Sequence, residues 1–142
     1  MRMMICLALL CLLTSDQKAQ EKPSWQRLYT YDDSAVELDA ANVTFGSAFT
    51  GRVRVRFSYE KTQPPTRKGG ARYKSVVETM ECRCDDRLYR VARVERFDGK
   101  GNCVEIDEAD ANAEWKPASY MGMRSKMFSP ACNLIYEKKR NP

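Results

Sequence analysis

The feature that most constrains the fold is a strict alternation of basic and apolar side chains between residues 52 and 57. Arginines occupy positions 52, 54 and 56, and the apolar residues beside them are Val53, Val55 and Phe57. Successive side chains of a β-strand point to opposite faces of a sheet, so this period of two places the apolar groups on one face. Residues 51–59 are therefore predicted to form a half-buried strand of an antiparallel sheet.

Further strands are predicted from shorter stretches bounded by turn-forming residues. They cover residues 25–31, 35–38, 71–84, 87–97 and 103–106. Two prolines and two glycines make residues 63–70 a loop, because neither residue type suits a sheet interior. The run Asp98-Gly99-Lys100-Gly101-Asn102 predicts a hairpin turn. The chain is therefore expected to be mainly β-structure.

One helix is predicted near the C-terminus, from Ser119 to Phe128. Ser119 can cap it, and the residues near one face are Tyr120, Met123, Met127 and Phe128. Pro130 is expected to kink or end this helix, with residues 132–136 forming a helical turn or an extended segment. The predicted fold class is α+β, a mainly antiparallel β-sheet with one C-terminal α-helix packed on it.

The N-terminus has the pattern of a secretory signal peptide. Arg2 precedes an unbroken run of 11 apolar residues, Met3 to Leu13. This run is shorter than the ~20 residues that a membrane-spanning helix needs, and it fits the apolar region of a signal peptide. Cleavage is expected after Ala19; a lipoprotein signal at Cys11 is disfavoured because Leu10 stands where a small residue is preferred. Residues 20–142 then form one exported domain, without a transmembrane segment, in the periplasm, on the outer-membrane surface or secreted.

Four cysteines remain after signal removal, namely Cys82, Cys84, Cys103 and Cys132. An even number in a small exported domain indicates two disulfides. Cys82 and Cys84 lie two residues apart on a strand, about 7 Å from each other, which strains a direct bond. Each is therefore expected to bond elsewhere rather than act as a redox pair, and Cys132 near the helix is a natural partner. A zinc site is disfavoured because paired C-x-x-C motifs are missing.

The composition argues against catalysis. The chain contains no histidine, which excludes histidine-based triads, Cys–His nucleophile pairs and His-ligated metals. The paired carboxylates Asp32-Asp33 and Asp85-Asp86 stand in turn-like contexts, where aspartate has a structural role. The acidic residues between Asp107 and Glu114 lack the spacing and the glycine of an EF-hand. We therefore predict no catalytic residue, no metal and no cofactor, and a protein that is not an enzyme.

Charge is distributed unevenly along the chain. Residues 52–100 contain 14 basic and 7 acidic residues, whereas residues 101–116 contain 1 and 5. Such asymmetry favours acidic partners on the central strands, although arginines on the outer face of a sheet can also simply be solvated. Arg52, Arg54 and Arg56 with neighbouring tyrosines could form a nucleic-acid platform, but export argues against nucleic acid. Heparin-like or sialylated glycans and acidic patches of extracellular proteins are the better candidates.

Four stretches in this order resemble the bacterial surface-adhesin protein E family. The first is Trp25 followed by Tyr31 and Val36-Glu37-Leu38-Asp39-Ala40-Ala41-Asn42-Val43, and the second is Arg54-Val55-Arg56-Phe57-Ser58-Tyr59. The third is Tyr73-Lys74-Ser75-Val76-Val77-Glu78 leading to Cys84 and Leu88-Tyr89-Arg90. The fourth is Trp115-Lys116-Pro117-x-Ser119 before a helix and Cys132. The resemblance covers roughly residues 25–135.

The resemblance implies an antiparallel sheet and a C-terminal helix tied by one disulfide, which by position joins Cys84 to Cys132. Cys82 and Cys103 depart from the family pattern, and pairing what remains predicts a second disulfide between them. The family also implies binding of host extracellular-matrix or plasma glycoproteins and allows a homodimer. The matching basic positions are Arg67, Lys68, Arg72, Lys74, Arg83, Arg87 and Arg90.

The functional hypothesis is an exported bacterial binding protein that docks acidic partners electrostatically. Laminin, vitronectin, plasminogen and heparin-like chains are the candidate ligands. The arginines of the open sheet face and the loop at residues 67–74 would make the contact, with Tyr59, Tyr73 and Tyr89 as further contact groups. The alternative is a periplasmic or envelope-associated structural protein without a host ligand.

Overall fold

The computed structural model describes residues 21–46, 50–110, 112–120 and 125–142. The expected signal peptide, residues 1–19, lies outside these ranges. In the described part of the chain, no helix is both long enough and apolar enough to cross a membrane.

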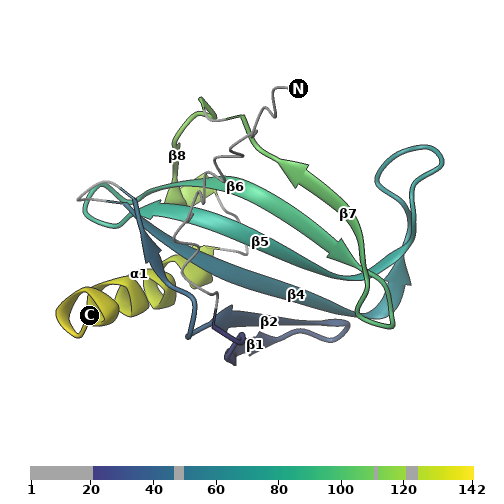
Figure 1. The fold of residues 1–142 in the computed structure, drawn as a ribbon, viewed down its shortest axis with the longest axis horizontal. Coiled ribbons are helices and arrows are strands. Elements are labelled where there is room, and N and C mark those ends of the chain that lie inside the picture. The colour runs from purple at the N-terminus through teal and green to yellow at the C-terminus, as the bar shows by residue number, and fades with distance from the viewer. Residues whose placement is uncertain (1–20, 47–49, 111, 121–124) are drawn as a thin grey trace, which may run out of the picture.

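Eight strands and a C-terminal helix make up the described fold (Figure 1). The strands are β1 (Trp25–Thr30), β2 (Ser34–Asp39), β3 (Thr44–Phe45), β4 (Gly51–Gln63), β5 (Tyr73–Arg83), β6 (Leu88–Phe97), β7 (Cys103–Glu108) and β8 (Lys116–Pro117). The helix α1 spans Ser125–Arg140. The predicted fold class, a mainly antiparallel sheet with one C-terminal helix, is confirmed.

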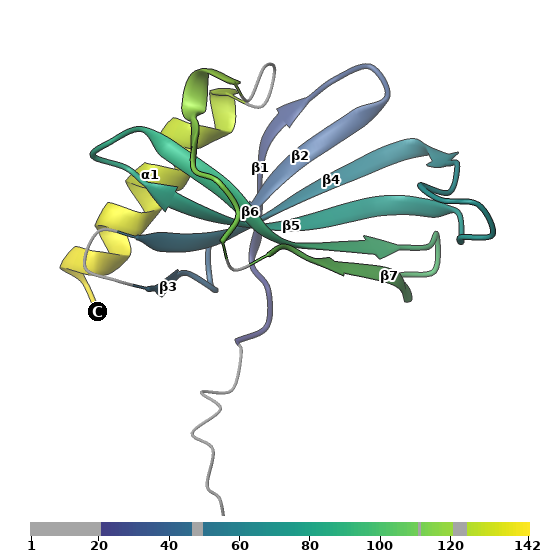
Figure 2. The same ribbon diagram turned by 90° about the horizontal axis from the view of Figure 1, so that it is seen from above.

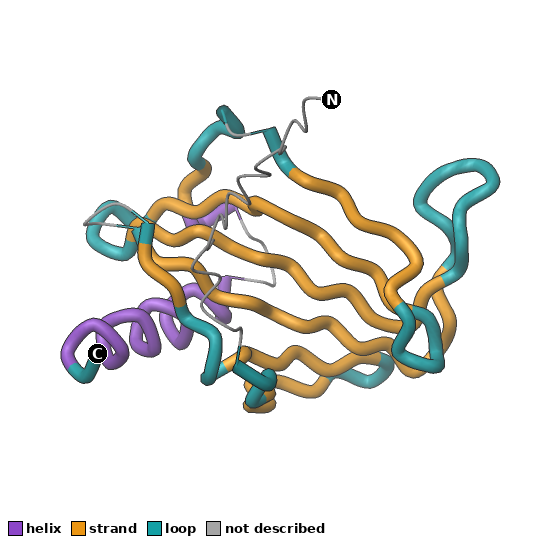
Figure 3. Tube along the Cα trace, in the orientation of Figure 1, coloured by secondary structure: helices purple, strands orange, loops and turns teal. Residues whose placement is uncertain are grey.

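All eight described strands belong to one antiparallel sheet in the order β1-β2-β4-β5-β6-β7, with the short β3 paired to β4 and β8 paired to β6. Each long strand pairs with the next long strand along the chain, so no connection has to cross over the sheet. The β4–β5 loop projects beyond the sheet at one end, and the β5–β6 turn lies at the other end (Figure 3).

The predicted alternation in β4 is confirmed by burial. Val53 and Val55 are fully buried and Phe57 nearly so, and all three face α1. The helix contributes Met127, Phe128, Ala131 and Ile135 to the same core. Helix α1 lies on one face of the sheet, near the end where β4 begins (Figure 2). In the part of the chain that the structure describes, no helix covers the opposite face, so we call it the open face.

Gly51 allows the close approach of α1 at the start of β4. A Cβ atom added there would lie 2.6 Å from side-chain atoms of Ile135, far inside van der Waals contact. Any larger residue would push the helix away from the strand and open the core between them.

The helix differs from its prediction in position and length. It spans Ser125–Arg140 rather than Ser119–Phe128, and Pro130 lies inside it. Ser119 lies in a short 3₁₀ turn at residues 118–120, and Met123 lies outside the described residues. Pro130 has no N–H to donate to the Lys126 carbonyl four residues earlier. The Tyr29 hydroxyl of β1 donates to that carbonyl instead, at 2.6 Å. A contact 97 residues distant in sequence thus compensates for the proline, which the local pattern could not reveal.

The disulfide between Cys84 and Cys132 is confirmed, with a Cα–Cα distance of 5.6 Å, and it ties α1 to the end of β5. The predicted Cys82–Cys103 bond is wrong, because both thiols are free. Cys82 is opposite Tyr89 near the start of β6, whereas Cys103 is opposite Phe97 at its end. Eight residues of strand separate these positions by about 26 Å, far beyond disulfide reach. Cys82 is buried in the core, and Cys103 is exposed on β7.

The two free thiols are expected to differ sharply in reactivity. Burial, together with the charge of Glu81, raises the pKa of the Cys82 thiol to about 12, so its reactive thiolate is scarce near neutral pH. In the native protein at about pH 8, maleimide should label Cys103 and leave Cys82 unlabelled until denaturant is added. Peptide mapping without reductant should recover only the Cys84–Cys132 pair. Equal labelling of both thiols in the native state would contradict this arrangement.

The Tyr29–Lys126 hydrogen bond should matter only because Pro130 is there. We expect Tyr29→Phe to lower the free energy of unfolding by about 1 kcal/mol. In a Pro130→Ala background, residue 130 regains an N–H for the Lys126 carbonyl, so the same Tyr29→Phe change should cost clearly less. Denaturant unfolding of the four proteins in this double-mutant cycle measures the difference. An equal cost in both backgrounds would disprove the compensation.

Candidate binding surface

The open face of the sheet is covered by charged side chains. Arg52, Arg54 and Arg56 of β4 point to this face because their apolar neighbours take the opposite one. The cross-strand register places acidic residues beside them, Glu37 of β2 opposite Arg56 and Glu81 of β5 opposite Arg52. The basic stripe of β4 therefore lies between two strands that carry carboxylates.

Each of these arginines is ion-paired. Arg56 Nε lies 2.7 Å from a Glu37 oxygen, and Arg52 Nε lies 2.7 Å from a Glu81 oxygen. Arg54 makes longer contacts, 3.5 Å to Glu95 and 3.7 Å to Asp39. Arg27 of β1 continues the pattern beside Glu37. On β6, Arg90 lies beside Glu81, and Arg93 lies beside Glu95 and Glu108. This set of pairs is called the arginine–carboxylate lattice below.

Three acidic residues of the lattice, Glu37, Asp39 and Glu81, are more deeply buried than the arginines that pair with them. Asp39 is completely buried, and Glu81 and Glu37 are 3% and 8% exposed. A carboxylate removed from water is costly unless it is paired and hydrogen-bonded, so these arginines are needed by the fold. The expected basic face, free to meet a ligand, is thus largely neutralised within the molecule. Sequence reasoning missed the buried carboxylates, although Glu37, Asp39 and Glu81 occupy alternating strand positions that could have indicated them.

Two tryptophans stack on arginines of the sheet. The Arg56 guanidinium lies 4.4 Å from the ring centre of Trp25, and Arg54 lies 5.7 Å from it. At the other end of the sheet, Arg90 and Arg83 lie 4.6 and 5.6 Å from the ring centre of Trp115. Such cation–π contacts fix both the ring and the guanidinium, which leaves these arginines less available to a partner.

The seven basic residues expected to bind a partner fall into two groups. Arg67, Lys68, Arg72 and Lys74 lie in or beside the β4–β5 loop, whereas Arg83, Arg87 and Arg90 lie at the β5–β6 turn. The nine residue steps from Lys74 to Arg83 along β5 span about 30 Å. The structure therefore does not bring the seven residues together into one site.

The group at the β5–β6 turn is engaged in contacts within the molecule. Arg90 bonds Glu81 and the backbone carbonyl of Ala113, and Arg83 pairs with Asp86. Arg87, in a left-handed conformation with φ 53°, lies over the Phe128 ring at 5.7 Å. These three arginines support the turn and the start of α1.

The group at the β4–β5 loop keeps more free charge. Thr66 and Arg67 anchor the loop to β7, with Arg67 2.6 Å from Glu105 and Thr66 donating to the same carboxylate at 3.1 Å. Lys68, Arg72 and Lys74 are exposed, and none of the described carboxylates lies within 4.0 Å of their charged nitrogens. We call these three residues the basic loop cluster. The β4–β5 loop projects past the sheet, well away from α1 (Figure 1).

The tyrosines expected as contact groups are also separated. Tyr59 and Tyr73 meet edge to face beside the β4–β5 loop, with ring centres 6.3 Å apart. Tyr89 lies at the opposite end of the sheet, where β8 pairs with β6. Tyr59 and Tyr73 are thus near the basic loop cluster, and Tyr89 is not.

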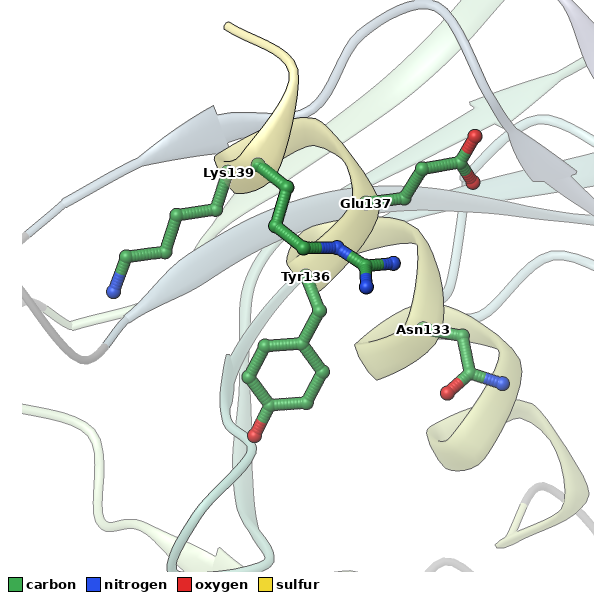
Figure 4. A pocket seen from close by; sticks show the side chains of 5 residues that line it. Asn133, Tyr136, Glu137 and Lys139 are labelled. Carbon is green, nitrogen blue, oxygen red and sulfur yellow. The ribbon is translucent and has the colours of Figure 1, made fainter.

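Two hollows accompany these surfaces. One, of about 750 Å³, is lined by Asn133, Tyr136, Glu137, Lys139 and Arg140. All five belong to α1, and their side chains spread from one helix without an opposing wall (Figure 4), so it offers little enclosure. The other, of about 650 Å³, lies on the open face against residues 41–44 and includes arginines that the lattice already pairs. Among the residues that the structure describes, no three His, Cys, Asp or Glu side chains gather where they could hold a metal ion.

Comparison with family models gives one match. The model described as surface-adhesin protein E matches residues 25–133, most of the chain. No curated protein and no solved structure matches the chain.

The lattice generates a prediction about acid stability. Burial alone would raise the pKa of Glu81, but hydrogen bonds from Arg90 and Arg52 outweigh burial and hold that pKa below its usual value of 4.5. A lowered pKa in the folded state means that the ionised carboxylate contributes stability above about pH 4.5, and that this contribution is lost as pH falls through the lowered value.

We therefore expect Glu81→Gln to destabilise the protein at pH 7 by about 1–3 kcal/mol, with a smaller difference from the wild type below pH 4. Urea unfolding at several pH values measures this. Glu60→Gln, which changes an exposed carboxylate of β4, is the matched control and should leave the stability at pH 7 nearly unchanged. A Glu81→Gln protein as stable as the control at pH 7 would show that the lattice contributes nothing.

Proposed function

The chain belongs to the surface-adhesin protein E family, and on that premise we propose that it is an exported adhesin that binds acidic host glycoproteins through the basic loop cluster. The family is one of surface adhesins, which supports a binding protein over an enzyme and an exported or cell-surface location over an internal one. The family resemblance drawn from the four sequence stretches is thereby confirmed. Whether the protein is periplasmic, on the outer-membrane surface or secreted stays a prediction, as does the homodimer.

The basic loop cluster is chosen as the binding surface because its charges are unpaired within the described ranges, whereas the arginines of the open face are paired. The arginines of the open face already neutralise buried carboxylates, so a ligand would have to compete with intramolecular partners for them. Lys68, Arg72 and Lys74 have no such competitor among the described residues. An acidic patch can therefore approach the basic loop cluster without breaking an existing ion pair.

The geometry of the loop also suits a docking role. Thr66 and Arg67 hold the base of the loop against Glu105 of β7. The loop is therefore partly ordered before binding and loses less conformational entropy when a ligand binds. Gly69 at φ 76° and the bond from the Gly70 N–H to the Arg67 carbonyl form a tight turn between Lys68 and Arg72. The Lys74 side chain runs beside Gly99 of the β6–β7 turn, where the exposed Lys100 adds a further positive charge.

We expect the purified protein to bind at least one of immobilised laminin, vitronectin, plasminogen and heparin at about 150 mM salt, where long-range attraction is largely screened. The triple variant Lys68→Ala/Arg72→Ala/Lys74→Ala should weaken this binding about tenfold or more, because interfacial charges set the encounter rate and the fit of the complex. Surface plasmon resonance gives both the association rate and the affinity.

The matched control removes three basic residues elsewhere on the surface, in the variant Lys22→Ala/Lys138→Ala/Arg140→Ala. It has the same net charge as the test variant and should bind like the wild type. Equal weakening in both variants would mean that net charge, rather than the loop, governs binding. No saturable binding to any of these ligands would favour the alternative, an envelope-associated structural protein without a host ligand.

A further inference from the structure

A hollow lined by three aromatic residues lies where β8 pairs with β6, at the end of the sheet opposite the basic loop cluster. Its volume is about 390 Å³, and it is an open hollow at the surface rather than an enclosed cavity. The lining residues are Tyr89, Glu114, Trp115, Lys116, Pro117 and Tyr120. The Trp115-Lys116-Pro117 stretch is one of the sequence motifs to which the proposed function gives no role.

The Trp115 ring is held in place before any ligand arrives. Arg90 and Arg83 lie 4.6 and 5.6 Å from its ring centre. Both arginines are themselves fixed, Arg90 by the buried Glu81 at 2.5 Å and Arg83 by Asp86. A flat aromatic surface that is already ordered loses little entropy on binding, which favours its use as a platform.

Tyr120 forms a second part of the wall and contributes little to the core. Its side chain is 77% exposed, the largest exposure among the large apolar residues that the structure describes. Ala118, two residues earlier, is only 3% exposed, so this segment of chain is anchored while Tyr120 points outward. An exposed tyrosine beside a fixed tryptophan is typical of binding sites, because the two rings offer contact area at a low entropic cost.

The chemistry of the lining indicates the class of ligand. The aromatic faces suit a ligand with a face of C–H groups, while Glu114 and Lys116, both exposed, supply an acceptor and a donor at the rim. A pyranose ring has both properties, since its C–H groups lie across the ring face and its hydroxyls around the edge. A polyproline segment would use the aromatic faces but has no hydroxyls for the charged pair.

We infer that this hollow binds a sugar residue of a glycan. The sugar ring stacks on Trp115 and Tyr120, and the sugar hydroxyls form hydrogen bonds with Glu114 and Lys116. The inference goes beyond the proposed function and stands without it, because the hollow shares no residue with the basic loop cluster. The inferred sugar site would be a second binding site, distinct in chemistry from the basic loop cluster, which favours acidic ligands.

The test is a titration of the purified protein with N-acetyllactosamine, 3′-sialyllactose and hexaproline, followed by two-dimensional NMR of the indole N–H signals. The chain has two tryptophans, and Trp25 lies on β1 away from the hollow, so its signal is an internal control. We expect a saturable shift of the Trp115 signal alone with at least one saccharide, in the millimolar range typical of single sugar units. No shift with either saccharide, or a shift with hexaproline only, would overturn the inference.

Tyr120→Ala should lower the affinity for the saccharide about tenfold, which is the effect of losing one aromatic contact. Tyr120 is exposed enough that this change should leave the fold intact, which thermal unfolding can check. Phe45→Ala, which removes an exposed aromatic side chain outside the hollow, is the matched control and should bind normally. Unchanged affinity in a folded Tyr120→Ala protein would also overturn the inference.

Discussion

The structure depends on the pairing of buried carboxylates with arginines across neighbouring strands. Among the described residues, one α-helix covers part of one sheet face, and the other face would otherwise expose its backbone and half of its side chains to water. Glu37, Asp39 and Glu81 lie beneath guanidinium groups from β4 and β6, whose long side chains cover the sheet as a second layer. Removing one member would leave a charge buried without its partner, so the strands of this face are coupled through their ion pairs.

This lattice decides where the molecule has surface left for binding. Because the central arginines are already paired, the numerical excess of positive charge on the middle strands does not translate into a free basic face. The side chains that remain exposed for binding lie instead beyond the paired parts of the strands. These are Lys68, Arg72 and Lys74 at one end of the sheet and Tyr120 at the other. The cross-strand register that stabilises the sheet pairs its central arginines, and the candidate binding sites therefore lie at the two ends of the sheet.

The sequence predicted the parts of the fold that follow from local periodicity. The alternation over Arg52 to Phe57 identified β4 and both of its faces, and the Asp98–Asn102 run identified the β6–β7 turn, where Gly101 has φ 86°. Features that depend on tertiary contacts could not be read in this way. Pro130 resembles a helix end in sequence, yet the helix continues because Tyr29 satisfies the carbonyl that the proline leaves open. The Cys82–Cys103 pairing followed from counting cysteines, whereas the register places them at opposite ends of β6.

The two proposed sites differ in chemistry and lie about one strand length apart on a single sheet, roughly 30 Å for the nine residue steps from Lys74 to Arg83. Neither site is large, and exposed charge alone gives modest affinity at physiological salt. A rigid spacer changes this, because engagement at one end raises the effective concentration of a second epitope on the same ligand at the other end. A glycoprotein carries acidic patches and glycans on one chain, so it is the kind of partner that two unlike weak sites on a rigid sheet would select over a free polyanion or a free sugar.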